Sequence, residues 1–424
     1  MKIKTGGIHY AWIILAGSIL VAATTQGPIG VINSNLFAPV IADLGGEMNK
    51  LTMYVSISAI TMALLYPLAS KYLATKHIGK IIALGILIEA SAYGLMYTYT
   101  EVWMFYISGV LTGIGGSIIS FMAFPILINM WFSEKAGVSL GIIVASRGIG
   151  GAIFSPVFAR LVAAFGWRKS CLIAMIVVMV ISLPVSLIVF KRPQEMHMQP
   201  YGAAPDTISE TGKGSSTDWG MDLRTGLRSP VFYLVWITGI FFSIAAGAPS
   251  YVASYSTMEL GNPATLSATA FSALNVAGIL CSLILGSIND RFGVKAGLLY
   301  GCSFQIAGCL LFIFCGHSIP LLMIGAVIFG LGNGMYHLQV PLLVRSVLGG
   351  KHYTEIWPIL MLGNSLIGGG LFSSLALFYD KLGSYKYMFA FCILLTAIAF
   401  VLGTVAANKG KKTRETLIAA ENKG

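Results

Sequence analysis

The residue with the most evident chemistry is Arg147, in the apolar, glycine-rich stretch GIIVASRGIGGAIF of residues 141–154. It lies about ten residues into a run long enough to cross a bilayer, or about 15 Å deep at a helical rise of 1.5 Å per residue. A guanidinium at that depth costs at least about 2.5–3.5 kcal/mol, so it is expected to face water, a carboxylate or a polar partner rather than lipid. Its planar fork of donors suits bidentate binding of a carboxylate. The alternative is a structural ion pair, most simply with Glu89.

Glu89 is a second ionisable residue at membrane depth, about nine residues into the apolar run of residues 80–98. Burial favours the protonated form of a carboxyl group, so Glu89 is a candidate for carrying a proton at neutral pH and for proton coupling. A protonated or paired role in the scaffold is an equal alternative.

A third polar group lies in the stretch NGMYHLQVP, where Asn333 and His337 are four residues apart with Tyr336 beside them. This spacing predicts that Asn333 and His337 share one helix face. An imidazole there would bind an anion or sense pH, and a hydrogen-bonded core histidine is the alternative. Three weaker candidates for contacts to a solute, each equally suited to bridging helices, are Gln26, Asn275 and Asn364.

The composition requires a membrane environment for these residues. Of the 424 residues, 56% are hydrophobic and 10% are charged, whereas soluble domains carry roughly 25% charged residues, and the mean hydropathy is +0.81. The net charge is +11, and the charged residues lie in the segments between apolar runs rather than on one face. This distribution argues against nucleic acid as a partner. The six cysteines lie in or beside apolar runs and are predicted to be small core residues, and nothing indicates a metal or cofactor.

Runs of about 20 apolar residues predict an all-α membrane protein of twelve transmembrane helices. The predicted spans are 10–38, 51–73, 80–98, 102–131, 137–162, 169–190, 230–256, 264–288, 295–315, 319–346, 354–378 and 385–407.

One long polar stretch, rich in Pro, Gly, Ser and Thr, separates the sixth span from the seventh and cannot bury a core of its own. The expected parts are an N-terminal six-helix bundle (1–190), a linker (191–229), a C-terminal six-helix bundle (230–408) and a tail (409–424). Weak similarity between the halves, such as RGIGGAIF and SLIGGGLF, indicates internal duplication, with chance similarity of glycine-rich helices as the alternative.

The distribution of Lys and Arg predicts the orientation. The N-terminus, the loops that follow even-numbered spans and the tail hold 20 of the 27 residues, and the opposite side holds six. By the positive-inside rule both termini and the linker are expected in the cytoplasm, with the chain in the cell (inner) membrane.

The loop after the eighth predicted span carries the motif GSINDRFGVK, residues 286–295. Glycine permits a tight turn, and Asp290 is placed to meet a helix N-terminus or a basic partner. The motif resembles the loop signature of the major facilitator superfamily, in which such loops latch the inward-closed state. The corresponding first-half loop, YLATKHIGK, has Lys76 where the acid would stand. The residues expected to act in the latch are Gly286, Asp290, Arg291 and Gly293.

Three further segments, HYAW at residue 9, NMWFSEKAGVSLGI at 129 and FGWRKS at 165, resemble the monocarboxylate and oxalate–formate branch of that superfamily. The resemblance implies two rocking bundles that move small organic anions. In that branch an arginine of the eighth span holds the substrate carboxylate, and the oxalate–formate antiporter adds a lysine in the eleventh span. Here Ser282 and Met361 stand at those positions, which argues against oxalate and leaves Arg147 to supply the charge.

The expected function is therefore secondary active transport of a small organic anion, most simply a monocarboxylate, by a monomer in the bilayer, with protons as a candidate coupling ion. Proton symport and anion exchange both remain open. The alternatives are a proton-coupled exporter of amphipathic or cationic compounds, in which Glu89 is the functional charge, and a transporter-like sensor without flux. An enzyme is the least supported class, because no nucleophile or metal-ligand motif is present.

Overall fold

The computed structural model describes residues 9–45, 48–74, 77–202, 219–368, 375 and 377–421. Apart from two isolated β-bridges, the regular structure of these residues is helical. Helices follow from the apolar runs, because a segment in lipid must satisfy its backbone hydrogen bonds internally.

The first half contains α1 (Tyr10–Leu44), α2 (Met48–Leu73), α3 (Ile78–Leu95), α4 (Phe105–Ile118), α5 (Phe124–Trp131) and α6 (Ala136–Val189). The second half contains α7 (Leu223–Arg228), α8 (Pro230–Ala245), α9 (Pro249–Ser254), α10 (Ala264–Phe292), α11 (Val294–Phe314), α12 (Ile319–Gly332), α13 (Val340–Leu348), α14 (Tyr353–Gly363), α16 (Leu377–Leu382) and α17 (Lys386–Glu421).

Within the described residues, eight helices are long and apolar enough to cross a membrane, so the chain is a multi-pass membrane protein. Several of the twelve predicted spans are merged or interrupted. The 54-residue α6 contains the two spans predicted at 137–162 and 169–190, which are divided at Gly166 with φ of +76°, a value that favours glycine. The span predicted at 102–131 is divided between α4 and α5, and the end of the span predicted at 354–378 lies partly outside the described residues.

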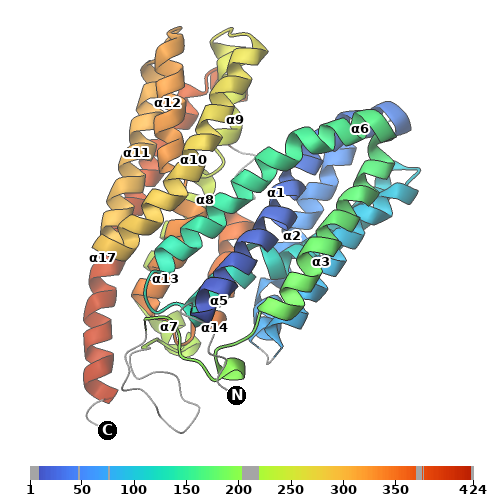
Figure 1. The fold of residues 1–424 in the computed structure, drawn as a ribbon. Helices are drawn as coiled ribbons and strands as arrows, with labels where there is room; N and C mark the ends of the chain where they lie inside the picture. Colours follow the sequence, from blue (N-terminus) through green and yellow to red (C-terminus); the bar gives the residue numbers. More distant parts are fainter. Residues whose placement is uncertain are drawn as a thin grey trace. The chain divides into compact units, whose positions relative to one another are not determined.

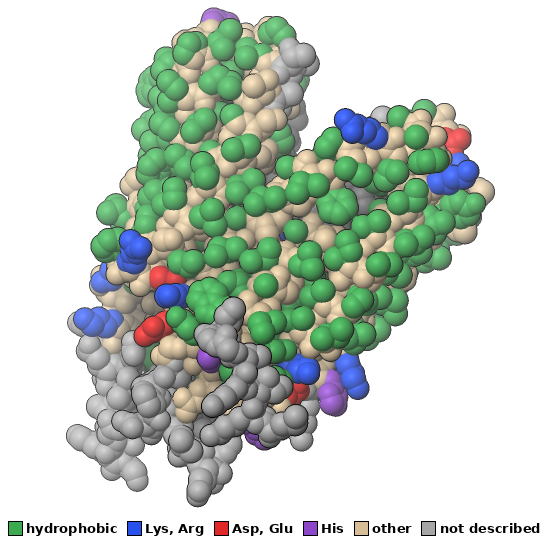
Figure 2. Space-filling model, viewed as in Figure 1, with side chains coloured by type: hydrophobic (Ala, Val, Ile, Leu, Met, Phe, Trp, Pro, Cys, Tyr) green, Lys and Arg blue, Asp and Glu red, His purple; other side chains and the backbone are tan. Residues whose placement is uncertain are grey.

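The surface agrees with a lipid environment. Large hydrophobic side chains are exposed in both halves, among them Ile60, Leu64, Val180, Val276 and Leu299. On the face drawn in Figure 2, hydrophobic side chains cover most of the helices, and most charged side chains lie towards the helix ends.

The chain divides into two compact units, Met1–Glu134 with Ser146–Ala204, and Lys135–Ala145 with Pro205–Gly424. In the first unit, α4 packs against both α2 and α3. Glycines allow this close approach: a Cβ at Gly109 would lie 2.6 Å from the backbone oxygen of Tyr54 on α2, and a Cβ at Gly115 would lie 2.7 Å from the backbone oxygen of Gly85 on α3.

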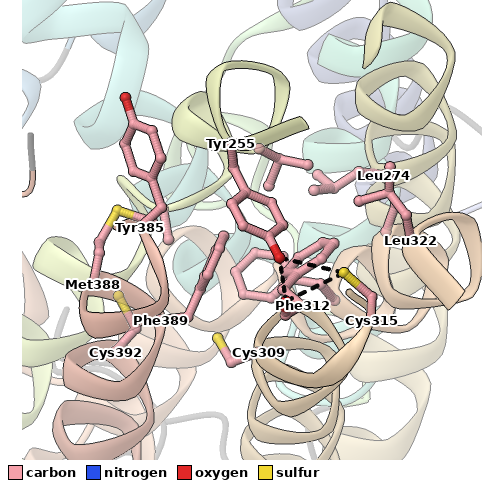
Figure 3. Packing of buried hydrophobic residues seen from close by; sticks show 14 of the residues in the cluster. Tyr255, Leu274, Cys309, Phe312, Cys315, Leu322, Tyr385, Met388, Phe389 and Cys392 are labelled. Carbon is pink, nitrogen blue, oxygen red and sulfur yellow. Dashed lines mark hydrogen bonds between the residues drawn. The ribbon is translucent and has the colours of Figure 1, made fainter. Parts of the chain in front are cut away.

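In the second unit, α11 packs against α12 and against α17, and Figure 1 shows α11 and α12 side by side. One of its hydrophobic clusters is drawn in Figure 3, where the hydroxyl of Tyr255 donates to the backbone oxygen of Phe312 at 2.6 Å. Cys309, Cys315 and Cys392 belong to this cluster. All six cysteines are buried and unpaired, which confirms the prediction that they are small core residues.

In each half, a carboxylate near the end of the first predicted span accepts hydrogen bonds from the segment that precedes the last predicted span. Asp43, near the end of α1, accepts hydrogen bonds from the indole of Trp167 at 3.0 Å and from the guanidinium of Arg168. Glu259, in the π-helix η5 (Tyr255–Glu259), accepts from the Ser384 hydroxyl at 2.6 Å and the Tyr385 N–H at 2.7 Å, just before α17. The same connection in both halves agrees with internal duplication.

The Asp43 cluster makes a pH-dependent contribution to stability. Hydrogen bonds from Trp167 and then from Arg168 hold the pKa of Asp43 below its ordinary value. A depressed pKa in the folded state stabilises the fold above the unfolded-state pKa, about 4 for Asp, and this contribution is lost as pH falls through the folded-state pKa. We therefore expect Asp43→Asn to melt about 1 °C below the wild type at pH 7, because exposed ion pairs contribute little, and the difference to shrink below pH 4.

Scanning fluorimetry of the detergent-solubilised protein measures this difference. The variant Arg168→Gln and the double variant complete a thermodynamic cycle, in which a coupled pair shows non-additive losses. Additive losses, or a gap that is constant with pH, would contradict the assignment.

The linker is anchored to both units at its described ends. The N–H of Tyr201 donates to the oxygen of Trp131 at 2.8 Å, next to the end of α5, and the N–H of Ser133 donates to the oxygen of Tyr201 at 2.9 Å. In the second unit the N–H of Met221 donates to the oxygen of Leu348 at 3.0 Å, at the end of α13. The linker is therefore attached next to the ends of the fourth and tenth predicted spans, and residues 203–218 between these anchors lie outside the described residues.

Candidate functional site

Segments of π-helix interrupt four of the predicted spans in the described residues. They are η3 (Ile119–Ala123), η5 (Tyr255–Glu259), η6 (Met335–Gln339) and η7 (Asn364–Gly368). A π-helix is rare and frequently marks a functional site. A nearby proline explains two of them: Pro125 lies shortly after η3 and Pro341 shortly after η6, and proline has no N–H to donate back along the helix.

Arg147 of α6 contacts the first of these segments. Its Nη2 donates to the backbone oxygen of Ser120 in η3 at 2.7 Å, and its guanidinium carbon lies 5.7 Å from the centroid of the Phe124 ring. A disturbed helix frees carbonyl oxygens for such bonds, and an aromatic face at this distance attracts a cation. The side chain is partly exposed. A backbone carbonyl and an aromatic ring are thus among the contacts of Arg147, as expected for a membrane-depth arginine that avoids lipid.

Glu89 is not the partner of Arg147. No ion pair joins the two side chains, both of which the structure describes. Glu89 is 5% exposed and lies between α3 and α4, where its Oε2 has no hydrogen-bond partner. The structural ion pair between Glu89 and Arg147 is therefore not formed, because Glu89 is directed into the α3–α4 interface.

The predicted polar residues of the tenth span lie where the α-helix is interrupted. Asn333 follows α12 directly, and Tyr336 and His337 lie in the π-helix η6, so the segment from Asn333 to His337 is not regular α-helix. His337 is exposed, whereas Asn333 and Tyr336 are partly buried. The Tyr336 hydroxyl shares hydrogen bonds with Ser243 of α8 and Ser365 of η7.

The three weaker candidates have different environments. Asn364 is 1% exposed, lies against Gly239 of α8, and neither atom of its amide has a hydrogen-bond partner. Asn275 is exposed and donates to the Phe271 oxygen of its own helix at 2.8 Å. The Nε2 of Gln26 is buried without a hydrogen-bond partner.

The loop motif forms a specific contact in the second unit. The two carboxylate oxygens of Asp290 accept hydrogen bonds from the backbone N–H groups of Gly137 and Val138, each at 2.7 Å, at the start of α6. Backbone N–H groups in the first turn of a helix have no acceptor within the helix, and the helix dipole is positive there, so this helix end favours a carboxylate. Gly293 ends α10 with φ of +82°, and Arg291 is exposed. Lys76 of the first-half loop lies outside the described residues.

Glycines bring the two helix backbones together beside Asp290. A Cβ at Gly137 would lie 2.6 Å from the oxygen of Gly286, and a Cβ at Gly141 would collide with the oxygen of Ser282. Small residues four apart on both helices permit this contact. The sequence shows the pairs Gly137–Gly141 and Ser282–Gly286, but nothing in it indicates that they pack on each other.

The model of the Major Facilitator Superfamily matches residues 14–373 and, in a second match, residues 235–422. The chain belongs to the major facilitator superfamily. This major facilitator protein has the all-helical fold of the superfamily and is a secondary transporter rather than an enzyme. Its described residues contain no group of three or more His, Cys, Asp or Glu that could hold a metal ion.

Relatives and solved structures agree with this assignment. The chain is 25% identical to the uncharacterized MFS-type transporter YcxA of Bacillus subtilis (strain 168) over 87% of this chain and 89% of the relative. It is 23% identical to monocarboxylate transporter 12-B of Danio rerio, over 83% and 78%.

Among solved structures, a bacterial homologue of the iron transporter ferroportin in an outward-facing state superposes with a TM-score of 0.68 at 14% identity, over 95% of this chain and 100% of that one. The fucose:proton symporter of E. coli gives 0.67 at 14% identity, over 93% and 97%. At these identities the structures establish the fold alone.

Proposed function

We propose that this transporter carries small organic anions, most simply monocarboxylates, by alternating access, with Arg147 binding the carboxylate group. The observation that carries the proposal is a guanidinium at membrane depth that donates to the backbone oxygen of Ser120 in a π-helix and lies over the Phe124 ring. A planar guanidinium offers a carboxylate two parallel charge-assisted hydrogen bonds. The similarity to a relative named monocarboxylate transporter 12-B supports this solute class.

The remaining polar residues are proposed contacts for the uncharged parts of the solute. Tyr336 and Asn333 are the stronger candidates, because Tyr336 lies in η6 and is hydrogen-bonded to two serines on neighbouring segments, and Asn333 lies shortly before η6. His337 is retained as a candidate in its exposed position. Gln26, Asn275 and Asn364 stay the weaker candidates.

The Asp290 contact is the proposed conformational gate. Its carboxylate stabilises the start of α6 in this conformation, and Gly286 and Gly293 shape the backbone around it. Arg291 follows Asp290 in the last turn of α10, so the motif expected in a loop begins within the helix. A solute shifts the populations of the gated states only if it binds them with different affinity.

Uptake into proteoliposomes tests the function. Purified protein is reconstituted and offered labelled acetate, lactate, pyruvate and oxalate, together with a labelled lipophilic cation, with and without an inward proton gradient. The proposal predicts saturable uptake of the monocarboxylates over protein-free vesicles. Protein-dependent transport of the cation without transport of any carboxylate would favour an exporter, and solute-dependent tryptophan quenching without flux would favour a sensor; either result overturns the proposal.

A further inference from the structure

We infer that the carboxyl group of Glu89 binds the proton that moves together with the solute anion, so that the protein is a proton symporter. This inference rests on the proposed function, because it assigns the coupling ion of the same transport cycle. It is carried by the buried position of Glu89, by the lack of a hydrogen-bond partner at its Oε2, and by Ser120, which borders the space around Glu89 and accepts a hydrogen bond from Arg147.

The interface between α3 and α4 is shaped around the Glu89 side chain. A Cβ at Gly115 would lie 2.6 Å from the Cβ of Glu89, so a larger residue on α4 would displace the acid. The Oε1 of Glu89 and the Oγ of Ser120 each lie 3.5 Å from the point where a Cβ of Gly116 would stand, with the Met62 methyl group of α2 at 3.6 Å. Two consecutive glycines therefore create the space that the carboxyl group occupies.

The surroundings of Glu89 do not stabilise a negative charge. On α3 it faces Tyr93, beyond which lie Tyr54 of α2 and Cys171 of α6, all neutral groups. The α4 surface contributes Gly115 and Gly116. Burying an ionised carboxylate without a partner is far more costly than burying the protonated acid. Glu89 is therefore expected to hold a proton in this conformation.

Ser120 borders both this acid and the proposed anion site. Its hydroxyl oxygen and the Glu89 Oε1 each lie 3.5 Å from the point where a Cβ of Gly116 would stand, and its backbone oxygen accepts a hydrogen bond from Arg147 Nη2 at 2.7 Å. While Glu89 is protonated, it does not compete with the solute carboxylate for the charge of Arg147. When Glu89 releases its proton to the solvent, its carboxylate attracts Arg147 and competes with the solute, which promotes release of the anion. One proton and one monocarboxylate then cross together without net charge.

The test separates exchange of the solute from its accumulation. Proteoliposomes containing wild type, Glu89→Gln or Glu101→Gln are assayed for counterflow of labelled lactate at equal pH and for uptake driven by an inward proton gradient. Glutamine has the shape of the protonated acid, so Glu89→Gln is expected to keep counterflow and to lose gradient-driven stimulation by at least about tenfold. Glu101, an exposed acid that accepts a hydrogen bond from Trp103, serves as the control and should keep both activities.

Two outcomes overturn the inference and leave the proposed function intact: wild type that exchanges lactate without responding to a proton gradient, and Glu89→Gln that responds as wild type does. If wild type moves no monocarboxylate at all, the proposed function fails. Infrared spectroscopy of the purified proteins then decides the proton site independently. The carbonyl stretch of a protonated carboxyl group should be present in wild type and absent in Glu89→Gln, and equal bands in both would refute the assignment.

Discussion

Replacement of Arg147 by glutamine is expected to reduce the kcat/KM for monocarboxylate uptake about 100-fold, because a solute carboxylate loses charge-assisted hydrogen bonds of about 1.5–3 kcal/mol each. Glutamine keeps a polar amide group and removes the positive charge and the planar guanidinium fork. Initial rates of labelled lactate and pyruvate uptake into proteoliposomes measure the effect over a range of solute concentrations.

Two variants control for other causes. Arg160→Gln removes an exposed arginine from the same helix and should leave the rate unchanged. Arg147→Lys keeps the charge but not the planar fork, so an intermediate rate is expected. Wild-type uptake by Arg147→Gln, with the protein folded and monodisperse, would remove Arg147 from the solute site.

The position of Arg147 was predictable from the sequence, but its partner was not. The depth of Arg147 in the bilayer follows from counting residues along its apolar run. Because a charge in lipid is costly, the side chain is expected to contact a polar group. The identity of that partner depends on the π-helix at Ser120, which arises where Pro125 cannot donate a backbone hydrogen bond and where α4 packs between α2 and α3. The proline is visible in the sequence, whereas the helix packing is not.

Glu89 illustrates a limit of reasoning from charge alone. Two opposite charges at membrane depth suggest an ion pair, because each would neutralise the other. The structure instead places Glu89 against Gly115, and Arg147 against Ser120. The packing of small residues between helices decides which neighbours a side chain meets. These helix pairings cannot be deduced from a single sequence.

The prediction that Asn333 and His337 share one helix face stays a prediction. It assumed 3.6 residues per turn through the tenth span, but α12 ends at Gly332 and a π-helix follows. By contrast, the multi-pass helical fold was predictable, because apolar runs of about 20 residues have few other solutions in a bilayer. The pattern of apolar residues therefore predicts that these helices exist. Where a π-helix interrupts them, the pattern does not determine which way a side chain points.

Replacement of Asp290 by alanine is expected to speed hydrogen exchange of the backbone amides at the start of α6 about 30-fold, which corresponds to a loss of about 2 kcal/mol of local stability. The variant leaves the N–H groups of Gly137 and Val138 without the carboxylate that accepts both hydrogen bonds at 2.7 Å. Local opening is then less costly, because the helix end loses its cap and the charge that faces its dipole. Mass spectrometry of peptides covering residues 133–145 measures the exchange in nanodiscs.

A matched control distinguishes loss of this contact from a general loss of stability. Asp222 caps α7 in the same unit through the Thr225 N–H at 3.3 Å, so Asp222→Ala removes an acid of similar type without touching α6. We expect exchange at residues 133–145 to be unchanged in Asp222→Ala and intermediate in Asp290→Asn, which keeps one acceptor oxygen. If Asp290 acts as the gate, Asp290→Ala also alters the uptake rate, because it changes the relative stability of the gated states. Unchanged amide exchange in Asp290→Ala would show that the carboxylate does not stabilise this contact, and the gate would then depend on the glycine packing alone.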